Sequence, residues 1–163
     1  MKVGVVGAGG LGYHHVRILR ESADVEFVGF YESRADRATQ VASELGATAF
    51  PSLEALIGAT DALTIVVPTP AHYAVARQAL EAGRHLLVEK PLAATLAEAD
   101  ELVSLAAARG VVLQTGHVER FNRAVRAALP YVDKPRFIES NRLAQFNPRG
   151  ADVAVVLDLM IHD

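Results

Sequence analysis

The stretch VGVVGAGGLG, residues 3–12, decides the fold because it joins a β-branched run to a cluster of glycines. The run Val3–Val6 predicts a short buried strand. Apolar or aromatic side chains then recur with helical spacing at positions 11, 15, 18 and 19, which predicts that a helix begins directly after the glycines. Glycine in a regular element costs about 0.5–1 kcal/mol relative to alanine. Four glycines between a strand and a helix therefore indicate a turn that brings bare main chain close to a ligand.

The glycines have the spacing of a dinucleotide-binding turn, Gly7-x-Gly9-x-x-Gly12. In such a turn the first glycine permits a tight bend, the second lets main chain approach a pyrophosphate, and the third lets the helix pack closely on the strand. The helix N-terminus offers N–H groups and partial positive charge to the phosphates. A tight turn without a ligand is the alternative. The cofactor-binding residues that we expect here are Gly7, Ala8, Gly9, Gly10, Leu11 and Gly12.

A carboxylate follows at the position where this type of site binds ribose. Glu32 lies 20 residues after Gly12, at the end of a second expected strand, Val25–Tyr31. A carboxylate there accepts hydrogen bonds from ribose hydroxyls and repels a 2′-phosphate, so NAD is favoured as the cofactor. Arg34 offers a positive charge two residues later, which leaves NADP open.

The rest of the chain alternates between the two kinds of element. Further strands are expected over 47–50, 61–67, 85–89 and 111–115, and helices over 38–45, 52–57, 76–82 and 96–109, one of them opened by a Thr95/Glu98 capping box. This order predicts an α/β fold, a Rossmann-type doubly wound parallel sheet over residues 1–118. A helix over 120–129, a strand over 136–146 and an apolar helix over 152–161 predict the first elements of an incomplete second domain, residues 119–163, and hence a fragment.

Composition narrows the possible partners. Among 163 residues, 51% are hydrophobic and 21% charged, the net charge is -3 and cysteine is absent. We therefore expect a packed core, no thiolate metal site and no attraction to nucleic acid or anionic membranes. Without cysteine, a signal peptide or an apolar run of about 20 residues, a cytoplasmic location is expected.

Two other strand ends are predicted at the same edge of the sheet as the glycine turn. VPTPAH, residues 67–72, and VEKP, residues 88–91, both follow expected parallel strands, and open α/β sheets bind ligands at that edge. The ammonium group of Lys90 at this edge can polarise a hydroxyl or carbonyl oxygen. Pro91 restricts Lys90 to extended conformations. Spacing alone allows a surface lysine beside a turn proline equally well.

Taken together, GAGGLG, Glu32, VPTPAH, VEKP, GHVERFN at 116–122 and DLMIH at 158–162 resemble the Gfo/Idh/MocA family of NAD(P)-dependent sugar oxidoreductases. The resemblance spans the chain and implies a Rossmann domain followed by an α/β domain through which members form oligomers. It implies three catalytic residues, Lys90, Asp158 and His162. It also implies that Pro68, Thr69, Pro70, His72, Glu89 and Lys90 lie beside the nicotinamide.

The implied reaction transfers hydride between a sugar hydroxyl carbon and the nicotinamide, with His162 or Lys90 taking the hydroxyl proton. The sequences GHVERFN and LMIHD most resemble those of family members that act on UDP-N-acetylhexosamines, so a nucleotide sugar is the expected substrate. A non-catalytic dinucleotide-binding module, such as a redox sensor, is the main alternative. An S-adenosylmethionine methyltransferase also uses a glycine turn but does not require the EKP segment at residues 89–91. No chemistry is assigned to His14 or His15.

Overall fold

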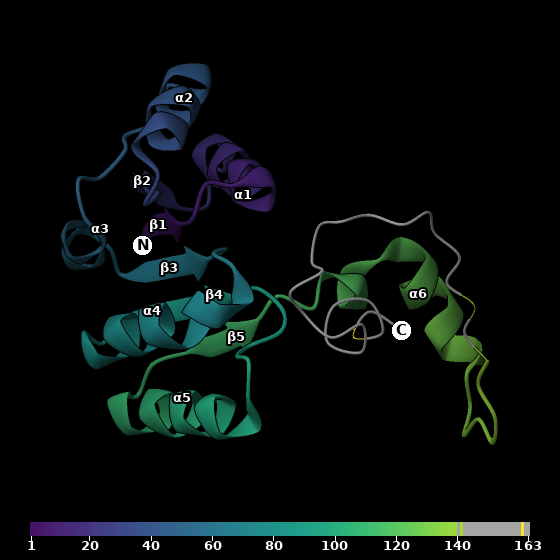
Figure 1. Ribbon diagram of the computed structural model, residues 1–163. Coiled ribbons are helices and arrows are strands. Elements are labelled where there is room, and N and C mark those ends of the chain that lie inside the picture. Colours follow the sequence, from purple (N-terminus) through teal and green to yellow (C-terminus); the bar gives the residue numbers. More distant parts are fainter. Residues whose placement is uncertain (140, 142–160, 162–163) are drawn as a thin grey trace. The chain divides into compact units, whose positions relative to one another are not determined.

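The computed structural model describes residues 1–139, 141 and 161 (Figure 1). It divides the chain into a compact unit, Met1–Thr115, and a second unit that begins at Gly116. Within the described part of the chain, no helix is both long and apolar enough to cross a membrane.

The first unit is built on one five-stranded parallel sheet with the order β2-β1-β3-β4-β5 (Figure 1). The strands are β1 (Lys2–Val6), β2 (Glu26–Tyr31), β3 (Ala62–Ile65), β4 (His85–Val88) and β5 (Leu113–Thr115). The helices are α1 (Gly10–Glu21), α2 (Ala35–Leu45), α3 (Leu53–Ala59), α4 (Thr69–Glu81) and α5 (Leu96–Arg109). The chain reverses its direction of winding between β1 and β3, the point at which doubly wound sheets bind ligands. The predicted fold class is confirmed.

Helices cover both faces of this sheet because its central strands are apolar on both sides. All four residues of β3 are buried, as parallel strands between two helical layers require. Along β1, Val5 joins the core under α1 and α2, and its neighbour Val6 joins the core under α3, α4 and α5. This alternation follows from the two-residue period of a strand.

Most predicted helix ends are confirmed, but one predicted strand is not. The Thr95/Glu98 capping box opens α5, and Gly46 and Gly110 end α2 and α5 in the left-handed conformation. The strand expected over 47–50 reduces to a single bridge between Phe30 and Ala49.

The predicted helix α1 is confirmed, but the residues whose spacing predicted it are not its most buried ones. Leu11 and Ile18 are 37% and 56% exposed, and the buried residues are Gly12 and Val16. The absence of a side chain at Gly12 lets that side of α1 pack closely against the turn. In α5, Leu96 is similarly exposed while Leu102 is buried.

The described residues of the second unit form short elements. They are η1 (Val118–Phe121), α6 (Arg123–Ala128) and η2 (Leu129–Tyr131). The single helix expected over 120–129 is interrupted at Asn122, whose side-chain oxygen accepts the Ala124 N–H at 2.9 Å. The described residues 136–139 are not in a strand, and the helix expected over 152–161 lies outside the described residues except for Ile161.

Candidate functional site

The fold requires a glycine at two positions of the turn, Gly7 and Gly12, but not at Gly9. Gly7 adopts φ +91°, and a Cβ there would lie 2.6 Å from the Val66 carbonyl oxygen. A Cβ on Gly12 would collide with the Gly7 carbonyl oxygen. A Cβ on Gly9 would have no heavy atom within 4 Å. Gly7 is therefore needed for the bend and Gly12 for helix packing, whereas nothing in the fold itself excludes a side chain at Gly9.

The start of α1 presents main chain rather than side chains. Its N-cap is Gly9, with no side-chain cap, and its first turn carries no acidic residue. Helix N-termini leave N–H groups without intrahelical partners, and these groups attract anions. The open side of Gly9 and this uncapped helix start together form a cradle suited to a phosphate group.

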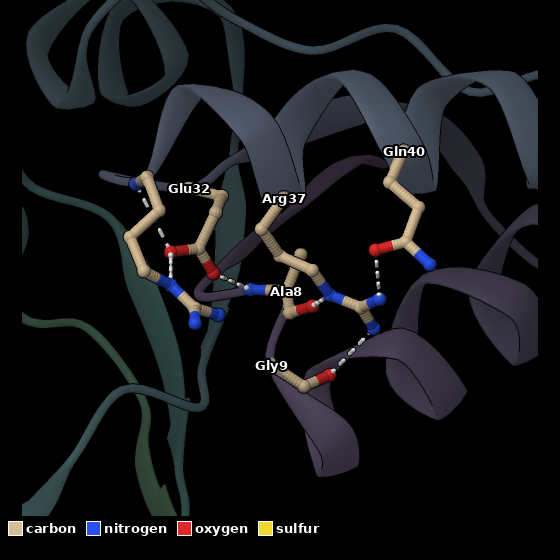
Figure 2. Close-up of polar contacts among 6 residues, drawn as sticks. Ala8, Gly9, Glu32, Arg37 and Gln40 are labelled. Atoms are coloured by element: carbon tan, nitrogen blue, oxygen red, sulfur yellow. Dashed lines mark hydrogen bonds and ion pairs between the residues drawn. The ribbon is translucent and has the colours of Figure 1, made fainter.

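Two charged side chains, those of Glu32 and Arg37, hold the turn by hydrogen bonds to the main chain of Ala8 (Figure 2). Glu32 Oε2 accepts the Ala8 N–H at 2.8 Å. Arg37 Nε donates to the Ala8 carbonyl oxygen at 2.8 Å, and Arg37 Nη2 donates to the Gly9 carbonyl oxygen at 3.4 Å. Ala8 is fully buried, and both of its main-chain polar groups are satisfied by side chains, one from Glu32 directly after β2 and one from α2. The turn therefore holds its shape through contacts within the protein.

Glu32 is ionised and its second oxygen is occupied. Oε1 accepts from the main-chain N–H and from Nε of Arg34, both at 3.2 Å. Burial alone would raise the pKa of Glu32, but the hydrogen bonds from Ala8 and Arg34 and the charge of Arg34 together lower it. The negative charge expected at the ribose position is thus present.

The strand ends that follow the turn lie at one edge of the sheet. Main-chain hydrogen bonds continue the ladder past the strands, from Val66 N–H to Val6 at 2.8 Å and from Glu89 N–H to Ile65 at 3.0 Å. Because β1, β3 and β4 are neighbours, the glycine turn, VPTPAH and VEKP are brought together. Their predicted shared edge is confirmed in the geometry.

We call residues 89–91, the last three of VEKP, the EKP corner. In it, the buried carboxylate of Glu89 contacts His15. Glu89 is 7% exposed, and its Oε1 lies 3.3 Å from His15 Nε2. Glu89 Oε2 accepts the main-chain N–H of Lys90 at 3.3 Å. Burial would raise the pKa of Glu89, but the hydrogen bond and charge of His15, with those of Lys90, lower it. The peptide bond between Lys90 and Pro91 is cis, which the sequence analysis did not predict.

A second histidine joins the EKP corner to VPTPAH. His72 is 1% exposed, its Nδ1 lies 2.8 Å from the Pro91 carbonyl oxygen, and its Nε2 lies 2.8 Å from the Val67 carbonyl oxygen. A neutral imidazole carries one N–H, so one of these contacts is a donated hydrogen bond, and both become so in the doubly protonated ring. His72 thus ties the two loops together, and its contact with a cofactor stays a prediction.

The structure brings most of the predicted site residues to this edge. Pro68 is the N-cap of α4, and Thr69 and Pro70 form the start of that helix. Asp158 and His162 lie outside the described residues. Within the described residues, no group of three histidine or acidic side chains is placed to hold a metal ion.

Sequence reasoning missed His15 and Arg37 as parts of the site. His15 shares the helical spacing of apolar residues, so the pattern gave no sign of its contact with Glu89. Arg37 lies five residues after Glu32, on a helix face that the sequence marks only as polar.

Comparison with known proteins gives one family. The model of an oxidoreductase family with an NAD-binding Rossmann fold matches residues 1–117. UDP-N-acetylglucosamine 3-dehydrogenase from Acidithiobacillus ferrooxidans is 43% identical over 168 residues, covering 100% of this chain and 52% of the relative. Inositol 2-dehydrogenase 3 from Saccharopolyspora erythraea is 35% identical over 139 residues, covering 82% and 40%.

Solved structures agree. The structure of the Acidithiobacillus ferrooxidans enzyme superposes with a TM-score of 0.90 at 42% identity, over 99% of this chain and 53% of that one. A protein of gentamicin A biosynthesis in complex with NAD has a TM-score of 0.75 at 29% identity, over 82% and 39%. The chain therefore spans about half the length of the first relatives it matches.

Proposed function

The chain belongs to the Gfo/Idh/MocA oxidoreductase family, and from this premise we propose that the whole protein is an NAD-dependent dehydrogenase acting on a sugar hydroxyl group. The family model covers 117 of the 163 residues. The observation that carries the proposal is the meeting of the open glycine turn and Lys90 at one edge of the sheet.

The residues present fit a dinucleotide. The open side of Gly9 and the uncapped start of α1 would hold the pyrophosphate, because main-chain N–H groups there are not covered by a side chain. The ionised Glu32 would accept hydrogen bonds from the adenosine ribose hydroxyls. When bound, the nicotinamide supplies the site that exchanges hydride with substrate.

The chemical role that we propose for this chain's residues concerns the substrate oxygen. The ammonium group of Lys90 stabilises negative charge that develops on that oxygen. From the family resemblance, Asp158 orients His162, and His162 takes the hydroxyl proton. The expected effect of Lys90→Ala in the whole protein is loss of turnover with NADH affinity largely kept. Unchanged turnover would refute the role of Lys90.

We favour NAD over NADP because the nearby arginines are already engaged. Arg34 contacts Glu32, and Arg37 contacts the carbonyl oxygens of the turn and Gln40 Oε1 at 2.9 Å. A 2′-phosphate would meet the Glu32 carboxylate and would have to displace these contacts. Titration with NADH and NADPH tests the preference, and tighter binding of NADPH would contradict it.

For the substrate we propose a nucleotide sugar of the UDP-N-acetylglucosamine class, on the basis of the 43% identity to a UDP-N-acetylglucosamine 3-dehydrogenase. The whole protein that carries these residues should be assayed with UDP-N-acetylglucosamine, other UDP-sugars and inositol. Turnover of inositol alone would overturn the substrate class. NADH binding without turnover of any of them would favour a non-catalytic module, and binding of S-adenosylmethionine in place of NADH would favour a methyltransferase. We also expect the whole protein to be a cytoplasmic homo-oligomer, which gel filtration and cell fractionation test.

A further inference from the structure

We propose that His15 and His72 are positioning residues that fix Lys90 by holding the residues on either side of it, an inference that rests on the proposed role of Lys90. His15 contacts the side chain of Glu89, and His72 contacts the main-chain carbonyl of Pro91. The two histidines come from different helices, α1 and α4, so two helices contact the EKP corner through them.

The His15 contact links the corner to the glycine turn. His15 lies on α1, three residues after Gly12, and the packing of Gly12 against Gly7 fixes that end of the helix to the turn. Glu89 is buried beside Lys90, and its two oxygens are taken by His15 Nε2 and the Lys90 N–H. A shift of Glu89 would therefore move the main chain of Lys90 relative to the turn.

The His72 contact links the corner to the end of β3. Both ring nitrogens lie 2.8 Å from main-chain oxygens, one on Val67 and one on Pro91, and the ring is almost fully buried. The ring acts as a spacer of fixed length between the ends of β3 and β4. Since a displacement of about 1 Å at a reacting group can lower a rate roughly 100-fold, such fixation has a direct use in catalysis.

The test uses the labelling rate of Lys90 in the chain as it stands. Lys2, Lys90 and Lys134 are its three lysines, so Lys2 and Lys134 serve as internal references. Trace acetic anhydride labels the three lysine amines and the N-terminal amine in competition, and mass spectrometry gives the rate at Lys90 relative to Lys2 and Lys134. The measurement needs neither cofactor nor turnover.

His15→Leu removes the contact with Glu89, and His14→Leu is its matched control because His14 is the exposed neighbour on the same helix. We expect His15→Leu to change the relative labelling of Lys90 by at least about threefold, since amine reactivity follows its exposure and charge environment. His14→Leu should leave it unchanged. His15→Gln, whose amide N–H reaches the position of Nε2, should restore at least half of the difference.

His72 is buried, so His72→Gln is tested beside a thermal melt. If the variant folds, it should change Lys90 labelling in the same measurement. If it does not fold, the comparison of His15→Leu with His14→Leu alone tests the inference. An unchanged ratio of Lys90 labelling to that of Lys2 and Lys134 in His15→Leu would overturn the inference, because that ratio is what general loosening or no effect would give.

The proposed function has a separate outcome in the same experiment. Saturating NADH should protect Lys90 of the unsubstituted chain, and ADP-ribose, which lacks the nicotinamide, should not. Labelling of Lys90 that NADH leaves unchanged would count against the proposed role of Lys90. The comparison of the His15 and His14 variants is made without ligand, so it tests the positioning of Lys90 whatever the outcome with NADH.

Discussion

Gly9→Ala separates the stability of the fold from its affinity for a dinucleotide. Gly9 has φ −63° and ψ −156°, an extended conformation with negative φ, and an added Cβ meets no heavy atom within 4 Å. Where the conformation is compatible, replacing glycine with alanine stabilises a protein by about 0.4–1 kcal/mol, through the unfolded chain. The melting temperature should therefore stay the same or rise by about 2–4 °C for a chain of this size.

Binding should respond in the opposite direction. The methyl group of Gly9→Ala occupies the open side of the turn, where a pyrophosphate would approach the main chain. Losing one charge-assisted hydrogen bond costs about 1.5–3 kcal/mol, so the Kd for NADH should rise roughly 10- to 150-fold. Fluorescence titration with NADH measures the Kd, and a melt followed by circular dichroism measures the stability.

Gly12→Ala is the matched variant with the reverse outcome. Its Cβ would collide with the Gly7 carbonyl oxygen, which is main chain and cannot rotate away. Overpacking of this kind costs about 1–3 kcal/mol of stability. Wild-type NADH affinity in Gly9→Ala, or a larger loss of stability in Gly9→Ala than in Gly12→Ala, would refute the division of roles among the glycines.

Three further predictions concern charged residues. Arg37→Met removes the bonds to the carbonyl oxygens of Ala8 and Gly9 and should raise the Kd for NADH about tenfold, measured by the same titration, whereas Arg17→Met, at a surface pair with Glu21, should not. Glu32→Gln removes the charge that opposes a 2′-phosphate, so the ratio of the Kd values for NADPH and NADH should fall about tenfold, and an unchanged ratio would exclude Glu32 as the selective group. The folded-state pKa of Glu89 lies below its usual value of 4.5, so ionised Glu89 stabilises the fold above pH 4.5 and that contribution is lost as the pH falls below it. Melts across this range should show a weaker acid dependence in Glu89→Gln than in the unsubstituted chain, and equal slopes would contradict the assignment.

The sequence predicted those features that depend on local chemistry. The glycine turn, the capping box of Thr95 and Glu98, and the glycine ends of α2 and α5 each need particular residues at fixed offsets, so the residues identify them. The parallel order followed from strands alternating with helices. Glu32 could be placed because it stands at a known distance from the turn.

The features that were missed depend on contacts between distant segments. The buried side of α1 includes Gly12, and the spacing of apolar residues cannot indicate a contact made by a residue without a side chain. The contact of His15 with Glu89 joins residues 74 positions apart, and that of Arg37 with Ala8 joins residues 29 apart. A polar residue on a helix gives no local sign of which backbone or carboxylate it will meet.

The central claim is that the glycine turn of this chain binds an adenine dinucleotide, and calorimetric titration of the 163-residue chain with NADH tests it most directly. We predict one saturable site per chain, with micromolar affinity and competition by ADP-ribose. The absence of saturable heat up to millimolar NADH, from a chain that melts cooperatively, would contradict the claim.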